Sequence, residues 1–449
     1  MSATDDRLAT TLLRPLERGG IKWFLFVGFL ATIVASGLFA WFFQMNRGFG
    51  LTGLGWPIYW GFLITDFVFW IGISHAGTLI SAILRLVNAG WRRPVTRCAE
   101  VITAFALMIG GLFPIIHLGK PWLFFWLVPY PNQRLIWPNF RSPLVWDFFA
   151  ISTYLTGSLL FLFLPMIPDF ALVRDRSTGI RKTIYGALAL GWRGTTHQWH
   201  RLETAMQIMA IAIIPVAVSV HTIVSFDFSM APVPMWHSSI FGPYFVAGAI
   251  FSGIAGLIIA MAALRRVLKL HEYLEDIHFE NLGKLLLTMS LLWGYFTFNE
   301  RLTAWYGNHV AEYNTFRATQ DGPYSPLFWT MVLVNFVIPV IILSIRRFRT
   351  ITGCVIASFG VVIGMWLERY LIVVPSLAFK FLPYSWGAYM PRPTEIIITI
   401  STFAAMTLLY TLFAKFIPII SIWEMRAGEH APIEEMAAAS ESRLGETHA

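Results

Sequence analysis

Long apolar stretches alternate with short polar segments along almost the whole chain. Each stretch has about 20 residues or more, the length that a helix needs to cross the hydrocarbon core of a bilayer. The pattern predicts an all-α polytopic membrane protein with about ten transmembrane helices and little room for a soluble domain. The predicted spans are 23–43, 57–84, 98–118, 143–166, 203–225, 242–264, 282–303, 325–345, 352–374 and 394–414.

The composition agrees with this pattern. Of the 449 residues, 56% are hydrophobic and 13% are charged, and the mean hydropathy is +0.63, whereas soluble domains are nearer a quarter charged. Residues 1–22 carry both signs of charge, and the first apolar run lacks a small-residue cleavage site, so we expect a tail and a true span rather than a signal peptide. Segment 424–449 is polar and predicted to be a disordered or loosely helical tail, which leaves 23–423 as the membrane domain.

The basic residues are distributed unevenly over the loops. Of the 33 Lys and Arg residues, 23 lie in the two tails and the loops on the same side, and 8 lie in the alternate loops. The positive-inside rule therefore predicts that both termini are cytoplasmic. The net charge of +8 follows from this bias, because the basic residues are scattered and form no nucleic-acid-binding patch.

Two parts of the chain echo each other weakly. Segments 55–59 and 242–245 open the second and sixth spans with Gly, Pro and Tyr, and both spans end in arginine. Since four spans restore the direction of the chain, this echo predicts repeat units 57–225 and 242–374, each a four-helix bundle, with two peripheral helices. Chance is the alternative, because these residue types are common at membrane interfaces.

Two ionisable residues face each other across one predicted outer loop. His117 ends the third span and Asp147 opens the fourth. Ionisable groups at membrane depth are costly and indicate function. An imidazole and a carboxylate there suit proton exchange with a quinol, since histidine titrates near neutral pH. Trp122, Trp137 and Trp146 are candidates for the apolar walls of such a site. The alternative, equally weighted, is that His117 and Asp147 only cap helix ends.

A second set of ionisable residues lies inside the predicted spans. A proton path through Asp66, His75, Glu300 and Glu368 with Arg369 is one interpretation. Internal ion pairing that fixes helix packing is the other, and it is favoured for Glu368 and Arg369. Because adjacent side chains on a helix point about 100° apart, we expect this acid and base to meet partners on neighbouring helices. These charges also give some support to a secondary transporter.

Other redox and transport classes fit less well. Cys98 and Cys354 are too few for an iron–sulfur cluster held by four thiolates and are expected to be small buried residues. No span carries the paired histidines of stacked haems, although His117 with His221 remains a geometric option for one outer haem. No channel filter is evident.

Four stretches carry a resemblance to a known family: HLGKP at 117–121, RSPLVWDFFAISTYLTGSLLF at 141–161, SVHTIVSFDF at 219–228 and WHSSIFGPYFVAGAIFSG at 236–253. They resemble the NrfD/polysulfide-reductase (PsrC-like) membrane-subunit family. Within it, the likeness is greatest to the quinol-oxidising subunit of bacterial alternative complex III, called ActC. It runs over roughly residues 20–420.

This resemblance implies a function. A family member of this type holds no redox cofactor, oxidises menaquinol near the periplasmic face of the bacterial inner membrane, and passes electrons to an iron–sulfur subunit and then to multi-haem cytochromes c. The family's quinol-site histidine and aspartate fall on His117 and Asp147. Lys120 stands where arginine is usual, so charge is kept but a bidentate fork is lost. A second NrfD-like subunit is an expected partner.

The resemblance leaves three alternatives open. The first is a non-catalytic paralogue of the ActF type, and the second is a quinone-interacting subunit of a molybdopterin oxidoreductase. The third, the transporter, is less in keeping with these stretches.

Overall fold

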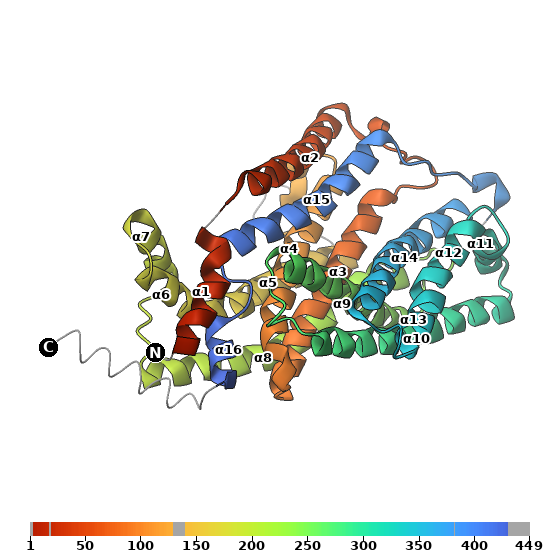
Figure 1. Ribbon diagram of the computed structural model, residues 1–449. Coiled ribbons are helices and arrows are strands. Elements are labelled where there is room, and N and C mark those ends of the chain that lie inside the picture. The colour runs from red at the N-terminus through yellow and green to blue at the C-terminus, as the bar shows by residue number, and fades with distance from the viewer. Residues whose placement is uncertain (1–2, 18, 129–139, 381, 430–449) are drawn as a thin grey trace.

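Helices form the regular structure of the described residues, which are 3–17, 19–128, 140–380 and 382–429 of the computed structural model (Figure 1). Within these residues, nine helices are long and apolar enough to cross a membrane, so the chain is a multi-pass integral membrane protein. They are α2 (Ile21–Arg47), α3 (Phe62–Leu86), α4 (Arg93–His117), α5 (Pro143–Phe163), α8 (Thr196–Ser229), α9 (Phe241–Val267), the composite Ser325–Ser344, α14 (Ile351–Ala378) and α15 (Pro393–Phe416).

The seventh predicted span, 282–303, lies within α10 (Asp276–Gly307). This helix is long enough to cross a membrane, but its more polar sequence keeps it out of the apolar set. The eighth predicted span is not one continuous α-helix either. It consists of α12 (Ser325–Val332), a π-helical segment η5 (Leu333–Val337) and α13 (Ile338–Ser344).

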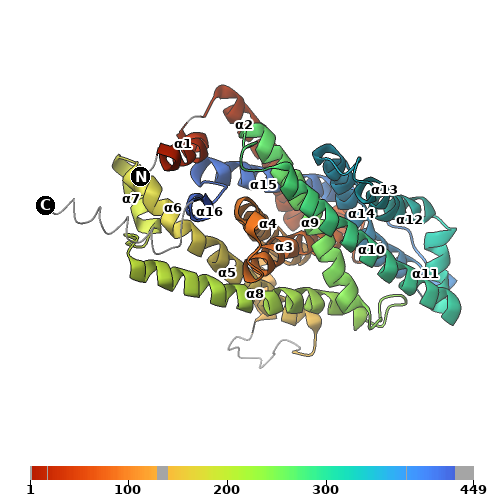
Figure 2. The ribbon, with the colours of Figure 1, turned by 60° about the horizontal axis from the view of Figure 1, so that its bottom comes forward.

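Helix α3 lies at the centre of the molecule and is buried throughout residues 63–82. It packs against α4, α8, α9 and α14, and its position in the middle is clear in Figures 1 and 2. Glycines allow the closest of these contacts. A Cβ atom at Gly77 would overlap the Ala99 carbonyl oxygen, and one at Gly253 would overlap the Ala76 Cβ. Small residues of this kind let membrane helices approach backbone to backbone.

The remaining membrane helices arrange themselves around α3. The first predicted unit corresponds to α3, α4, α5 and α8, and the second to α9, α10, the Ser325–Ser344 composite and α14. The two groups are joined where α3 packs against α9. The two peripheral helices, α2 and α15, pack along each other at one edge of the molecule (Figure 1). The repeat relation itself stays a prediction.

Both described chain ends contain helices that the sequence interpretation treated as tails. Helix α1 (Ala3–Glu17) contacts α15 and α16 (Ile422–Glu429) and buries Leu8, Leu12, Leu13 and Leu16. Glu424, predicted to open the polar tail, is buried, so the packed part of the chain extends beyond residue 423. The rest of the predicted tail, 430–449, lies outside the described residues.

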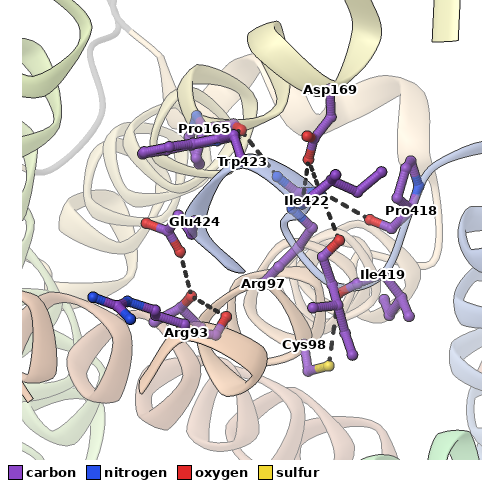
Figure 3. A network of polar contacts seen from close by, with 12 residues as sticks. Arg93, Arg97, Cys98, Pro165, Asp169, Pro418, Ile419, Ile422, Trp423 and Glu424 are labelled. Atoms are coloured by element: carbon purple, nitrogen blue, oxygen red, sulfur yellow. Dashed lines mark hydrogen bonds and ion pairs between the residues drawn. The ribbon is translucent and has the colours of Figure 1, made fainter. Parts of the chain in front are cut away.

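A buried arginine fixes the segment that leads into α16 (Figure 3). Arg97, from α4, is fully buried and donates through Nη1 to Asp169 Oδ2 at 2.6 Å and to the Pro418 carbonyl at 3.0 Å. Its Nη2 donates to the Pro165 carbonyl at 2.9 Å. Asp169, on α6 (Ile167–Asp175), also accepts the Ile422 amide at 3.2 Å. The guanidinium fork thus connects three distant parts of the chain.

Glu424 is held nearby by two more arginines. Arg85 donates to it, Arg92 Nη1 lies 3.2 Å from its Oε1, and Thr96 Oγ1 lies 3.4 Å from its Oε2. Burial alone would raise the pKa of this carboxyl, but the charges of Arg85 and Arg92 outweigh burial and hold its pKa below the ordinary value. Glu424 is therefore a carboxylate that links α16 to the ends of α3 and α4.

Candidate functional site

His117 is the last residue of α4, and the turn after it is shaped by a glycine. Gly119 has φ +71°, and a Cβ atom there would lie 2.7 Å from the Phe49 ring. Phe49 in turn lies against the His117 imidazole, with ring centroids 5.8 Å apart. In the part of the chain that the structure describes, His117 Nδ1 is buried without a hydrogen-bond partner. The turn therefore presents an imidazole whose Nδ1 is open to a ligand or water.

Asp147 lies in the second turn of α5, four residues after Pro143, which opens the helix. Its side chain is buried and interacts with the carboxyl group of Asp227, near the end of α8. Asp227 is also buried, and one oxygen of each carboxyl has no hydrogen-bond partner among the described residues. Two adjacent buried carboxyls hold one shared proton more readily than two negative charges.

The pairing of Asp147 with Asp227 differs from the sequence interpretation, which paired Asp147 with His117. Across the described residues, no hydrogen bond or ion pair joins His117 to Asp147 directly. The interpretation missed Asp227, although the same signal was present: an acidic residue at the end of an apolar run. The carboxyl pair and the unpartnered imidazole lie on helices that pack in sequence, α8 on α5 and α5 on α4. Together they still provide what quinol chemistry needs, namely proton acceptors that no internal bond has already satisfied.

The predicted wall residues lie in different settings. Lys120 and Trp122 are exposed, Trp122 to 59%, and Trp122 belongs to a short 3₁₀ helix, η3 (Pro121–Leu127). Trp146 is half-buried, and its indole nitrogen donates to the Phe140 carbonyl at 2.7 Å, so its polar edge is already used. Trp137 lies outside the described residues. Trp122 is thus placed on a surface rather than in the interior of this chain.

Asp66, the first candidate of the proton path, is completely buried in α3. Its two oxygens accept hydrogen bonds from Trp366 Nε1 at 2.8 Å and from Thr399 Oγ1 at 2.6 Å. These donors come from α14 and α15, so Asp66 ties three helices together. This arrangement fits the packing interpretation at least as well as a role in proton transfer.

His75 faces a different part of the molecule. Its Nδ1 lies 2.6 Å from the Ile71 carbonyl and its Nε2 lies 2.9 Å from the Ala217 carbonyl, and both carbonyls can only accept. Its ring packs against the His221 ring in a tilted arrangement, with centroids 4.5 Å apart and an interplanar angle of 54°. His221 is fully buried, and among the described residues neither of its ring nitrogens has a hydrogen-bond partner of good geometry. The two imidazoles are neighbours, which the sequence alone did not reveal.

Glu368 and Arg369 form a third group. Contrary to expectation, they contact each other, with Arg369 Nη1 2.7 Å from Glu368 Oε2. Glu368 does meet a neighbouring helix, because its Oε1 accepts the Trp293 Nε1 at 2.5 Å. The Arg369 guanidinium lies 4.7 Å above the Phe245 ring, which in turn borders His221. Glu300 lies close enough to Glu368 for electrostatic interaction. The described contacts therefore leave Asp66 apart from His75 and from this group.

Histidine, cysteine and carboxylate side chains are also the usual protein ligands of metal ions. Within the described residues, no group of three or more His, Cys, Asp or Glu side chains is arranged to hold a metal ion. Cys98 and Cys354 are both buried and lie on different helices, α4 and α14.

A comparison with protein families identifies the class to which these residues belong. Residues 50–380 match the family described as polysulphide reductase, NrfD, which covers well over half of the chain. The chain belongs to this NrfD family. The matched region contains His117, Asp147 and Asp227, together with His75 and Arg369. It ends before α15, which supplies the Thr399 donor to Asp66.

Three NrfD-like relatives are similar over most of their length. A putative membrane subunit of a dimethyl sulfoxide reductase from Halobacterium salinarum is 24% identical over 93% of this chain and 96% of its own. A selenate reductase subunit from Mesobacillus selenatarsenatis is 24% identical over 88% and 94%. The Hdr-like menaquinol oxidoreductase integral membrane subunit of Archaeoglobus fulgidus is 23% identical over 82% and 84%. This NrfD chain is a membrane subunit of a respiratory oxidoreductase.

Proposed function

We propose that this chain binds a quinol beside Asp147, Asp227 and His117 and takes part in its oxidation. The observation that carries the proposal is the buried Asp147–Asp227 pair at the joint ends of α5 and α8, with oxygens that no described residue satisfies. Buried carboxyls without partners are costly, so a ligand or water that completes them is expected. The unpartnered Nδ1 of His117, at the end of α4, supplies a second kind of acceptor.

The chemistry balances with these groups and an external electron acceptor. A quinol that becomes a quinone loses two protons and two electrons. The Asp147–Asp227 pair, holding one proton, accepts a second from one hydroxyl, and the His117 imidazole accepts the proton of the other. The electrons leave to an iron–sulfur cluster in a partner subunit.

The relatives support this proposal and bear on the partners. One is named as a membrane subunit of a menaquinol oxidoreductase, which favours menaquinol as the substrate. We propose an assembly of the alternative complex III type, with an iron–sulfur subunit, multi-haem cytochromes c and a second NrfD-like subunit, in the inner membrane with both termini cytoplasmic. The names of two relatives favour a second arrangement, in which the partner is a reductase of the dimethyl sulfoxide or selenate type.

The test compares two site variants with a matched control in the purified native complex. Asp147→Asn and Asp227→Asn keep side-chain size but remove the acceptor charge. We expect each to lower quinol-dependent reduction of the complex by about a hundred-fold or more, the usual contribution of general acid–base catalysis. Asp276→Asn removes a carboxylate that is largely exposed and, among the described residues, pairs with Arg265 alone, so turnover should not change.

The outcomes separate the alternatives. If both site variants assemble with their partners and retain full turnover, the quinol is oxidised elsewhere and this chain is a non-catalytic membrane subunit. If the chain purifies alone from gently solubilised membranes and is redox-inert, the transporter interpretation gains support. Proton transfer through Asp66, His75, Glu300, Glu368 and Arg369 is a separate proposal. Protons released per electron in sealed vesicles test it, and a ratio explained by quinol protons alone would contradict it.

A further inference from the structure

Helix α7 (Gly179–Leu188) stands apart from the helix bundle at the end of the molecule that also holds α1, α6 and α16 (Figures 1 and 2). It follows α6 and contacts it, and the Tyr185 hydroxyl donates to the Phe416 carbonyl at the end of α15 at 2.5 Å. The helix is therefore attached to the ends of two membrane-spanning segments, at the level where the bilayer surface lies.

Three sides of α7 have different chemistry. Arg181, Tyr185 and Leu188 share the side that faces the protein, where Tyr185 is buried and the Arg181 guanidinium lies 5.6 Å from its ring. Ile180 and Ile184 share a second side and are 81% and 53% exposed. Lys182 points away from both, on a third side, and is exposed. Since residues four apart share a helix face, the two isoleucines form one continuous apolar strip.

The segment around α7 is strongly basic. Between residues 174 and 201 it carries six Lys or Arg residues and one acidic residue, Asp175. Just after α7, Leu190 is 69% exposed and adds apolar surface to this segment, and Arg193, three residues later, is exposed. An apolar strip flanked by basic residues is the pattern of a helix that lies in the plane of a membrane interface.

We infer that α7 is an interfacial helix that inserts Ile180, Ile184 and Leu190 between the lipids and binds the anionic phosphates of the bilayer surface through Lys182 and Arg193. Phosphate groups of phosphatidylglycerol provide the negative charge that the segment complements. The Tyr185–Phe416 hydrogen bond couples this lipid contact to the end of α15. Bound lipid therefore restrains the same helix that supplies Thr399 to Asp66.

The test places a nitroxide spin label at Ile184→Cys or, as the matched control, at Lys182→Cys. The full chain, with its two buried cysteines replaced by alanine, is reconstituted into phosphatidylcholine vesicles with or without phosphatidylglycerol. We expect the Ile184 label to be accessible to dissolved oxygen and shielded from a water-soluble nickel chelate. The Lys182 label should show the reverse, because it projects from the adjacent polar side.

The anionic lipid supplies the second half of the test. Adding phosphatidylglycerol should raise the ratio of oxygen accessibility to nickel-chelate accessibility of the Ile184 label several-fold. The double substitution Lys182→Gln, Arg193→Gln should abolish that rise. Equal accessibility of both labels to the nickel chelate would overturn the inference. An Ile184 label that is shielded from both reagents in the native complex would also overturn it, because a protein would then cover the strip. If the depth of the Ile184 label in the bilayer does not change with phosphatidylglycerol, the inferred binding of anionic lipid is overturned.

Discussion

Replacing Arg97 by leucine should release the segment that joins α15 to α16. The substitution removes the hydrogen bonds to Asp169 at 2.6 Å and to the Pro165 and Pro418 carbonyls at 2.9 and 3.0 Å. It also leaves the Asp169 carboxylate buried, with the backbone amides of Ile422 and Trp423 as its remaining donors in this network. Because the charge of Asp169 is then uncompensated, the loss exceeds that of the hydrogen bonds taken singly.

Breaking a buried ion pair by removing one partner costs about 3–5 kcal/mol. If the free energy needed to open the segment locally decreases by that amount, the equilibrium constant for opening rises by roughly a hundred-fold to a few thousand-fold, at about 1.4 kcal/mol per factor of ten. Asp169→Leu combined with Arg97→Leu should recover much of the loss, because an apolar pair leaves no buried charge.

Cys98 reports this opening directly. Its sulfur lies 3.8 Å from the Ile419 carbonyl, within the segment that Arg97 holds, and it is buried. The rate at which a thiol reagent labels Cys98, in a chain with Cys354→Ala, measures how often the segment opens. A second chain with Cys98→Ala reports labelling of Cys354 on α14 and therefore global unfolding.

The control is Arg93→Leu, which removes the same charge one turn earlier on α4, where the described residues give its guanidinium no hydrogen bond or ion pair. We expect fast Cys98 labelling in Arg97→Leu, slow labelling in Arg93→Leu, and little change at Cys354 in either. Similar rates in both arginine variants would refute the reasoning. So would a double variant as labile as the sum of the two single variants.

Two further predictions concern other contacts. Because the pKa of Glu424 is lowered by folding, its contribution to stability is complete above the unfolded pKa of about 4.5 and is lost as pH falls through the folded pKa. The melting temperature should therefore fall with acidification in the natural chain and not in Glu424→Gln. Gly119→Ala should cost about 1–2 kcal/mol in backbone strain, push Phe49 toward His117 and lower quinol turnover. Gly179→Ala, at φ +59° in open space, should cost similar stability at unchanged turnover; equal turnover in both variants would disprove the link to the site.

Hydrophobic runs are enough to locate the membrane helices, because helix length in a bilayer is set by its thickness. They are not enough to say which helices touch. A helix such as α3, buried on all sides from residue 63 to 82, has no polar face to mark its orientation. The contact of α2 with α15 joins segments at opposite ends of the sequence, and no local pattern encodes it.

The candidate site shows the same division. His117 and Asp147 could be found because charge is rare at the ends of apolar runs. Asp227 could have been found by the same rule, but its proximity to Asp147 depends on the packing of α5 against α8. The leucines of α1, at positions 8, 12, 13 and 16, have the spacing of a packed helix, but the sequence interpretation missed this signal and treated residues 1–22 as a tail. The hydrogen bonds from Arg97 to backbone carbonyls could not be predicted, because a carbonyl acceptor is not marked by any residue type.

The central helix α3 also constrains how the protein is made. Asp66 receives one hydrogen bond from Thr399, which is 333 residues further along the chain, and another from Trp366. During synthesis α3 enters the membrane long before either donor exists, so the Asp66 side chain must wait in hydrated or loosely packed surroundings. Folding of the interior is therefore completed only when α15 has been inserted. A nascent chain that stops before α15 would leave one oxygen of the Asp66 carboxyl without its donor within the bilayer, a feature by which membrane quality control can distinguish it from the finished protein.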